Sequence, residues 1–305
     1  MADSRPSRCA PAALARDEPL VGTASRVRYW LVVEQWGPWG ADALLESRLP
    51  AAVATALAAS AGRHRVRVLL ARRPGDRRHE GDRRVFLAHT GADGSWIEHL
   101  DVPPGRLDDL AALDLAAVAR AEPPGIGAPG PDGLVLVCTN GRHDPCCADH
   151  GRPVVRALAA AGVDDVWECS HVGGDRFAAN VVVLPDGTYY GRVDPATAAD
   201  LVAAHRSGHL TLERYRGRSH LSPVAQAADL FARRHLDETR LDGLTVRSST
   251  AGEDGTTTVV VEQRGGATVE VVVASDRRDD PVRLTCHADR EGRPWAYRLV
   301  EVRAP

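Results

Sequence analysis

The chain has 305 residues, of which 44% are hydrophobic, enough for two or three domains with cores of their own. Its formal net charge is only -3 and both signs are interspersed, so no basic face is available for a phosphate backbone and we expect no nucleic-acid partner. The N-terminal "MADSRPSRCAPAALARDEPLVG" lacks the apolar core of a signal peptide, and no stretch approaches the ~20 apolar residues of a membrane-spanning helix. We therefore expect no membrane partner and a cytoplasmic location, where thiols stay reduced.

The first half of the chain alternates strand and helix signals. Residues 1–25 are predicted to be a flexible tail, and residues 26–120 follow the order β-α-β-β-β-α. Apolar and β-branched runs predict four strands and two apolar-periodic segments predict helices; the strands are 28–33, 65–71, 84–89 and 95–100, and the helices are 49–60 and about 106–120. Residues 121–133, "AEPPGIGAPGPDG", are so rich in Pro and Gly that we interpret them as a linker.

The same order returns after the linker, in residues 134–206. "LVLVC" and "VWEC" are strands, and "VVVLPDGTYYGRV" is two short strands around a Pro-Asp-Gly turn. Helices are predicted at 152–162 and 194–205, the second with Asp194 as N-cap and Pro195 in its first position. A βαβ unit followed by a hairpin and a closing helix is the thioredoxin-like arrangement. We interpret the two halves as a duplicated unit, of which only the second copy carries the thiols.

Residues 207–305 are predicted to form a small α+β domain. It consists of a helix at about 222–236 and an antiparallel sheet with strands at 256–264, 267–274, 282–288 and 294–302. The predicted fold class is therefore α/β, with two thioredoxin-like repeats followed by this C-terminal domain.

Two loops of the second copy carry the candidate chemistry. The right-handed crossover of a βαβ unit places the ends of its two strands side by side, so the loop after each strand faces the other. The loop after the first strand supplies three thiols, and the loop after the second supplies an imidazole, a carboxylate and two glycines that let the backbone bend closely around a cofactor; the residues are Cys138, Cys146, Cys147, His171, Asp175, Gly173 and Gly174. Thiolates and imidazoles drawn from two loops indicate a metal site, either iron-sulfur or zinc.

Three long segments, "CTNGRHDPCCADHGRP", "VWECSHVGGDRFAAN" and "LPDGTYYGR", resemble the sucrase/ferredoxin-like family over roughly residues 20–205. The resemblance implies a thioredoxin-like ferredoxin domain with a [2Fe-2S] cluster held by two cysteines and two histidines. It assigns Cys138 and Cys147 as thiolate ligands and His171 as the first imidazole. Asp175 stands in the place of the second histidine, which is a departure from the family pattern.

The identity of the fourth ligand stays open at this point. Cys146, His143 and Cys169 are alternatives to the assigned ligands, and His143 would restore a second imidazole. An Asp ligand would make the oxidised site more negative and lower its potential, and Arg142 and Arg176, each beside a candidate ligand, would offset part of that charge.

The other cysteines are interpreted as structural. Cys9 lies in the predicted tail and is taken as incidental. Cys286 shares strand parity with Val282 and Leu284 and is expected to face a small core as an inert thiol. Cys169 is expected to pack at the end of a buried strand.

The sequence thus predicts an electron carrier or redox sensor with an unidentified redox partner protein, and a homodimer is possible. No glycosidase-type carboxylate pair is evident, and we do not expect an enzyme. The alternatives are a zinc-stabilised thioredoxin-like binding module that uses the same four positions, and a thiol oxidoreductase. The adjacent Cys146 and Cys147 lack the C-x-x-C spacing of the latter.

Overall fold

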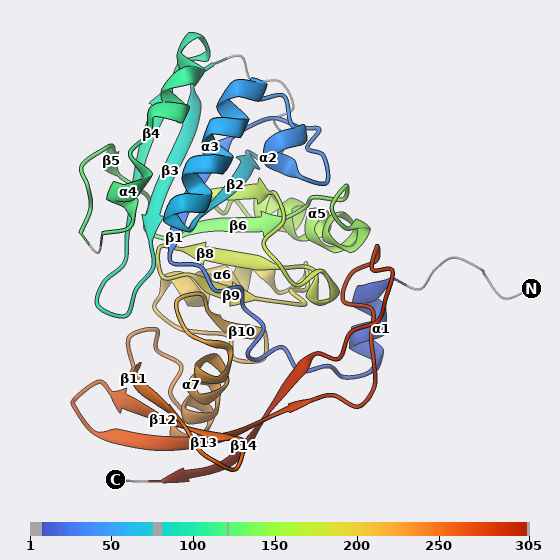
Figure 1. The fold of residues 1–305 in the computed structure, drawn as a ribbon, viewed down its shortest axis with the longest axis vertical. Helices are drawn as coiled ribbons and strands as arrows, with labels where there is room; N and C mark the ends of the chain where they lie inside the picture. Colours follow the sequence, from blue (N-terminus) through green and yellow to red (C-terminus); the bar gives the residue numbers. More distant parts are fainter. Residues whose placement is uncertain (1–7, 76–80, 121, 304–305) are drawn as a thin grey trace, which may run out of the picture.

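The apolar runs predicted as strands assemble into one large mixed sheet and one small antiparallel sheet (Figure 1). The computed structural model describes residues 8–75, 81–120 and 122–303. The large sheet has ten strands in the order β10-β9-β8-β6-β7-β2-β1-β3-β4-β5, and the small sheet has four in the order β11-β12-β13-β14. The mixed α/β class and the separate antiparallel sheet are confirmed.

The first half of the chain supplies β1 to β5. β1 pairs in parallel with β2 and antiparallel with β3, and β4 continues beyond β3. The Ala-rich helix α3 packs Val53 and Leu57 into the core that it forms with β1 and β2. The elements are β1 (Tyr29–Glu34), α2 (Ala43–Glu46), α3 (Ala51–His64), β2 (Val66–Arg72), β3 (Arg83–His89) and β4 (Trp96–Val102).

The single helix predicted at 106–120 is wrong. The chain instead forms the 3-10 helix η1 (Pro104–Ala112) and the one-turn helix α4 (Leu115–Val118). Asp114 separates the two, because its side chain accepts hydrogen bonds from two backbone N–H groups at the start of α4. An Asp in this position favours a new helix start over continuation of the preceding one.

The second half supplies β6 to β10. β6 pairs in parallel with β7 and antiparallel with β8, and β9 and β10 continue outward. The two halves meet where β2 pairs antiparallel with β7. The elements are β6 (Leu134–Cys138), α5 (Pro145–Ala160), β7 (Val166–Cys169), η2 (Asp175–Phe177), β8 (Val181–Leu184), β9 (Thr188–Tyr190), α6 (Ala198–Arg206) and β10 (Tyr215–Arg218).

Both helices of this half differ from their predicted bounds. α5 begins at Pro145 and not at 152, because Asp144 accepts a hydrogen bond from the backbone N–H of Cys146 and Pro145 occupies the first turn. The adjacent cysteines therefore lie in a helix and not in a loop. α6 begins at Ala198; Asp194 caps a preceding turn by accepting from Ala196, not the helix itself.

The C-terminal part contains α7 (Pro223–Leu236) packed on the small sheet. The sheet strands are β11 (Leu244–Ala251), β12 (Thr256–Gln263), β13 (Thr268–Arg277) and β14 (Trp295–Arg303). β11 escaped prediction because most of its side chains are exposed and polar. The strand predicted at 282–288 is wrong: the segment has only an isolated bridge to Gly292 and otherwise forms part of a long loop.

Two segments predicted to lack regular structure contain some. In the predicted tail, residues 1–7 lie outside the described part, but α1 (Cys9–Ala15) is a helix that buries Cys9 and Ala13. The apolar contacts of this helix hold it in place, so the chain is not a free tail from residue 8 onward. In the predicted linker, β5 (Ala128–Pro129) pairs with β4.

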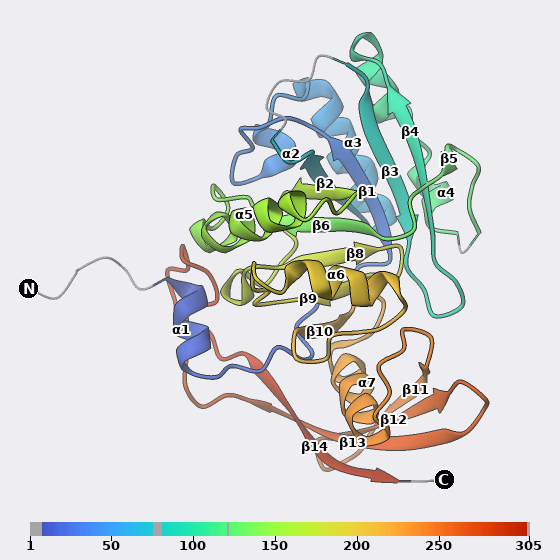
Figure 2. The ribbon, with the colours of Figure 1, turned by 180° about the vertical axis from the view of Figure 1, so that it is seen from behind.

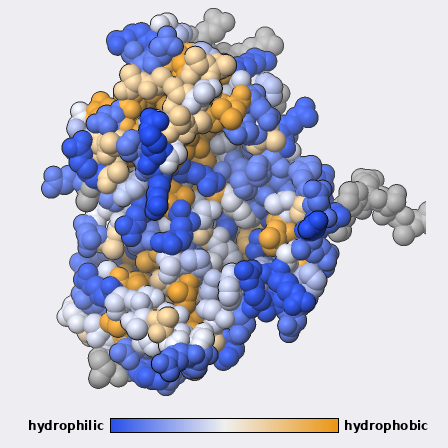
Figure 3. All heavy atoms as spheres, in the orientation of Figure 1, coloured by the Kyte–Doolittle hydropathy of each residue, from blue (hydrophilic) through white to orange (hydrophobic). Residues whose placement is uncertain are grey.

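The helices α3, α5 and α6 pack on the same face of the large sheet. Arg72 and Glu168, which pair across β2 and β7, lie on that face, with Leu70 under α3 and Val166 under α5. The opposite face packs against Ala24 and Val27 of the N-terminal segment. Figures 1 and 2 show that the strands of the two halves run in clearly different directions, so the sheet is strongly twisted. The face drawn in Figure 3 is largely hydrophilic, interrupted by small apolar patches. No helix among the described residues combines the length and apolar character of a membrane span.

Candidate metal centre

Two bends at one edge of the large sheet carry the candidate donors. β6 and β7 are neighbouring parallel strands, and their last residues, Cys138 and Cys169, pair in register. The chain leaves β6 through residues 139–144 into α5, and it leaves β7 through residues 170–174 into η2. Because the carboxyl ends of parallel strands share an edge, the two bends face each other, as the βαβ order predicts.

Cys138, Cys147 and His171 form the sulfur side of the site. Their donor atoms all lie within 4.8 Å of one another, and both thiols are free and fully buried. Cys147 points inward from the first turn of α5. This helix lies directly over the end of β6, since a Cβ atom at Gly151 would overlap the carbonyl oxygen of Cys138. A glycine in the middle of the helix therefore permits the two cysteines to meet.

His143, His171 and Asp175 form the nitrogen side, and their donor atoms also lie within 4.8 Å of one another. The two imidazoles stack with ring centroids 3.7 Å apart and an interplanar angle of 16°. Oδ1 of Asp175 lies 2.9 Å from Nδ1 of His171, and Oδ2 lies 4.0 Å from Nε2 of His143. Five donors thus gather in two groups that share His171.

The orientation of His143 is set by the first half of the chain. Its Nδ1 lies 3.2 Å from the carbonyl oxygen of Ala41, so Nδ1 carries the proton and donates it there. This contact leaves the lone pair on Nε2, the nitrogen that faces Asp175. His171 is held differently: its Nδ1 is buried and makes no hydrogen bond of good angle within the described residues.

The charges of the site are strongly coupled. Burial would lower the pKa of His171, but Asp175 and Cys138 raise it to about 9. Burial would raise the pKa of Asp175, but His171 holds it below its usual value. The hydrogen bond from Cys147 and the nearby imidazole hold the pKa of Cys138 well below that of a free thiol, while Cys138 raises the pKa of Cys147. Without a metal, the site therefore favours one thiolate and one carboxylate, and it keeps protons on His171 and Cys147 that a bound metal would displace.

A buried arginine holds the loop after β7 in place. Arg216 on β10 is fully buried and donates to the carbonyl oxygen of Gly173 at 3.0 Å and to Oδ1 of Asn180 at 2.8 Å. Gly174 has φ +81°, and a Cβ atom there would overlap the guanidinium; at Gly173 it would overlap Ser25. The two glycines thus make room for these protein groups. Sequence reasoning missed Arg216, since nothing in "RYRGRS" marks it.

Of the remaining predicted residues, only His143 belongs to the donor groups among the described residues. Arg176 pairs with Glu18 at 2.8 Å. Arg142 lines a groove described below. Of the alternative ligands, His143 lies in the site, Cys169 belongs to neither donor group among the described residues and packs in the core, and Cys146 points to a different cluster.

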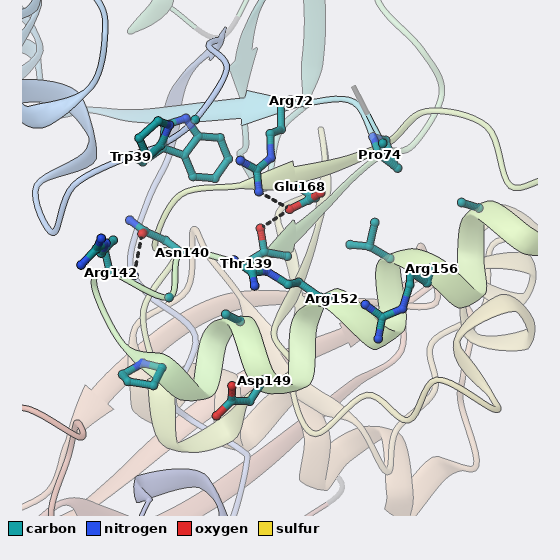
Figure 4. A pocket seen from close by; sticks show the side chains of 18 residues that line it. Trp39, Arg72, Pro74, Thr139, Asn140, Arg142, Asp149, Arg152, Arg156 and Glu168 are labelled. Carbon is teal, nitrogen blue, oxygen red and sulfur yellow. Dashed lines mark hydrogen bonds and ion pairs between the residues drawn. The ribbon is translucent and has the colours of Figure 1, made fainter. Parts of the chain in front are cut away.

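A groove of about 1120 Å³ runs along α5 beside the site. Figure 4 shows Arg152 and Arg156 on α5, and it shows Glu168 joined to Arg72 and Thr139 on the opposite wall. Arg142, which precedes His143 in the sequence, lies at one end. Arg72 and Glu168 neutralise each other, so Arg142, Arg152 and Arg156 outweigh Asp149 and the lining carries a net positive charge.

Of three comparisons with known proteins, one found a match. No curated protein and no solved structure matches the chain. The family model described as Sucrase/ferredoxin-like matches residues 20–217, which include both bends and the strand that carries Arg216. The chain therefore belongs to the sucrase/ferredoxin-like family.

Proposed function

We propose that the chain binds a [2Fe-2S] cluster through Cys138, Cys147, His171 and His143, and serves as an electron-transfer or redox-sensing protein. The observation that carries this proposal is the division of the donors into a sulfur group and a nitrogen group that share His171. A [2Fe-2S] centre of mixed ligation needs two thiolates at one iron and two imidazoles at the other. Family membership and the buried Nδ1 of His171 support the same assignment.

His143 fits the place of the fourth ligand better than Asp175. An imidazole that binds a metal usually donates its other ring N–H to a carbonyl or carboxylate, and His143 has that partner in Ala41. Two thiolates and two neutral imidazoles would also leave an oxidised cluster uncharged. Asp175 then acts as a buried carboxylate beside both rings, and the guanidinium of Arg216 lies close enough to balance its charge.

The exposure of the donors suits electron transfer. The thiols are fully buried, whereas the side chains of His171 and His143 keep 21% and 34% of their surface exposed. The bound group would supply one-electron uptake and release, and the chain would exclude water from its sulfur side. A redox partner would approach the imidazole edge, next to Arg142 and the positively charged groove.

We also interpret the two halves of the large sheet as two thioredoxin-like units. The support is their equal strand pairing: β1 and β6 each have a parallel neighbour across a helix and an antiparallel neighbour on the other side. Only the second unit carries donors, so one cluster per chain is expected.

Anaerobic purification followed by visible spectroscopy and metal analysis tests the proposal. We expect a brown protein with about two iron ions and two acid-labile sulfides per chain, whose colour dithionite bleaches. A colourless protein with zinc bound to Cys138 and Cys147 would instead establish the binding module, and metal-free disulfide reduction would establish the oxidoreductase.

Single substitutions distinguish the fourth ligand. His143→Ala should lose most of the iron, while Asp175→Asn should keep the iron and shift the reduction potential upward, because a nearby negative charge disappears. His150→Ala, an exposed histidine on α5, is the matched control and should change neither. If Asp175→Asn loses the cluster and His143→Ala retains it, the carboxylate is the ligand.

A further inference from the structure

Three cysteines outside the proposed iron site meet in a second cluster. Cys9 opens α1, Cys146 lies in the first turn of α5, and Cys286 lies in the loop between β13 and β14. Their Sγ atoms are 3.7 Å apart for Cys9 and Cys146 and 3.5 Å apart for the two other pairs. Asp144, the N-cap of α5, joins them, and one donor atom from each of the four residues lies within 4.8 Å of the others. Cys9 is therefore not incidental, and Cys286 does not face the core of the small sheet.

We infer that Cys9, Cys146, Cys286 and Asp144 form a second, structural metal site that holds one zinc ion. Tetrahedral Zn²⁺ with Zn–S bonds of about 2.3 Å separates its sulfurs by about 3.8 Å, and a carboxylate oxygen at about 2.0 Å lies about 3.5 Å from each sulfur. The three sulfur separations fall just below the first value. Both carboxylate oxygens of Asp144 lie 3.8 Å from Sγ of Cys9, close to the second.

The surroundings hold the four groups in place. Oδ1 of Asp144 accepts the backbone N–H of Cys146 at 2.9 Å, and Oδ2 accepts that of Cys286 at 2.6 Å. Each carboxylate oxygen keeps a further lone pair for a metal. The N-terminus of the sixteen-residue helix α5 and the guanidinium of Arg8, which adjoins Cys286, supply positive charge to a site rich in thiolates.

Other uses of the thiols fit less well. A disulfide has an S–S distance of about 2.05 Å and would pair only two of the three sulfurs, which would leave one buried thiol without a role. An iron-sulfur cluster spreads its thiolates over several irons, so it cannot use three sulfurs that are all mutually adjacent. A single tetrahedral ion uses all three.

The zinc ion would cross-link α1, the start of α5 and the loop between β13 and β14, which are distant in the sequence. Cys146 is 137 residues from Cys9 and 140 residues from Cys286. Figures 1 and 2 both show α1 and the loop between β13 and β14 side by side next to the start of α5. Since Cys147 follows Cys146 directly, the zinc site would brace the helix turn that presents a proposed iron ligand, and α1 packs against η2 on the same side.

Zinc and iron analysis of the full chain tests this inference separately from the iron site. Purified without chelators, the chain should contain about one zinc in addition to its iron. Cys9→Ser and Cys286→Ser should each lower zinc at least fivefold, while the protein keeps the visible spectrum of the iron site and most of its iron, because all proposed iron ligands remain. Cys169→Ala, a buried thiol in neither cluster, is the control and should lose no zinc.

A second measurement on the unaltered chain covers the case in which these variants do not fold. Titration with a mercurial reagent in the presence of a zinc dye should release one zinc as three thiols react, and Co²⁺ replacement should give the visible absorption of a tetrahedral thiolate site. Zinc-free protein, a disulfide among the three cysteines in mass spectra, or cysteine variants that retain zinc would overturn the inference. Failure of the proposed iron site would show as missing iron and colour while zinc persists, so the two are distinguishable.

Discussion

Replacing Arg216 by Met removes a buried charge that ties the candidate ligand loop to the rest of the fold. The guanidinium donates to the side chain and carbonyl oxygen of Thr23, to Gly173 and to Asn180. These groups belong to the N-terminal segment, the loop after β7 and the residue directly before β8. Met fills a similar volume without any donor, so the substitution isolates the polar function.

The expected loss of stability is a few kcal/mol. Oδ1 of Asn180 accepts in a buried bond and costs about 2 kcal/mol without a donor, while the three part-buried acceptors cost about 1 kcal/mol each, or about 5 kcal/mol for all four. Burial lowers the pKa of Arg216 from 12.5 to about 10, which corresponds to about 3 kcal/mol that the variant recovers by not burying a charge. The net expectation is a decrease of about 2 kcal/mol in the free energy of unfolding, together with a loss of at least half of the bound iron.

Arg233→Met is the matched control. Arg233 is also fully buried and pairs with Asp229 at 3.1 Å on α7, away from the candidate site. Its removal leaves the buried carboxylate of Asp229 without its ion-pair partner, although Tyr215 still donates to it, and should cost about 3 kcal/mol, but it should leave the iron content unchanged. Urea unfolding and iron analysis at low temperature measure both quantities. If Arg216→Met keeps its full iron content, or if both variants lose iron equally, then Arg216 does not position the ligand loop.

Three further outcomes are expected. Gly174→Ala should lower the free energy of unfolding by roughly 2 kcal/mol or more and reduce iron binding, because the residue has φ +81° and its Cβ would overlap Arg216. The control Gly162→Ala, with φ +68° and open space around its Cβ, should cost only about 1 kcal/mol. Equal costs would contradict the packing argument. Burial lowers the pKa of His220 from 6.5 to about 4. The neutral imidazole therefore contributes stability above pH 6.5 that is lost as the pH falls towards 4. In urea unfolding, the free energy of unfolding of His220→Gln should fall by about 3 kcal/mol less than that of the unaltered chain over this range, and parallel pH profiles would contradict the expectation. Tyr215→Phe should lower the free energy of unfolding by about 2 kcal/mol, since the hydroxyl donates at 2.6 Å to a buried carboxylate of α7, and an unchanged urea midpoint would show that this bond contributes nothing.

The candidate iron site was predictable in outline from local sequence signals. "LVLVC" and "VWEC" form buried parallel neighbours, and the handedness of the crossover alone brings Cys138 and His171 to one edge. The cap signal that starts α5 was equally readable, because Asp144 followed by Pro145 is typical of a helix start. A helix that starts there places the adjacent cysteines about 100° apart around its axis, so that they point in different directions.

Contacts between distant segments were not predictable in this way. The carbonyl group of Ala41, in the first half of the chain, binds Nδ1 of His143 and leaves the lone pair on Nε2. The ligand loop is hydrogen-bonded to Arg216 of β10. Cys9 contacts Cys286, which is 277 residues away in the sequence. Cys286 in particular follows an alternating pattern that suggests a strand, yet its backbone N–H bonds to Asp144 and not to a neighbouring strand.

The sequence by itself determined the elements whose signals are short in range: the strand runs, the Pro-Asp-Gly turn, the crossover and the three donors at its ends. Only the tertiary structure decided which nitrogen of His143 faces the site, which arginine supports the ligand loop, and that Cys9, Cys146 and Cys286 form a cluster. The physical reason is that caps, turns and alternation act over a few residues, whereas the meeting of segments more than a hundred residues apart depends on the packing of the whole chain.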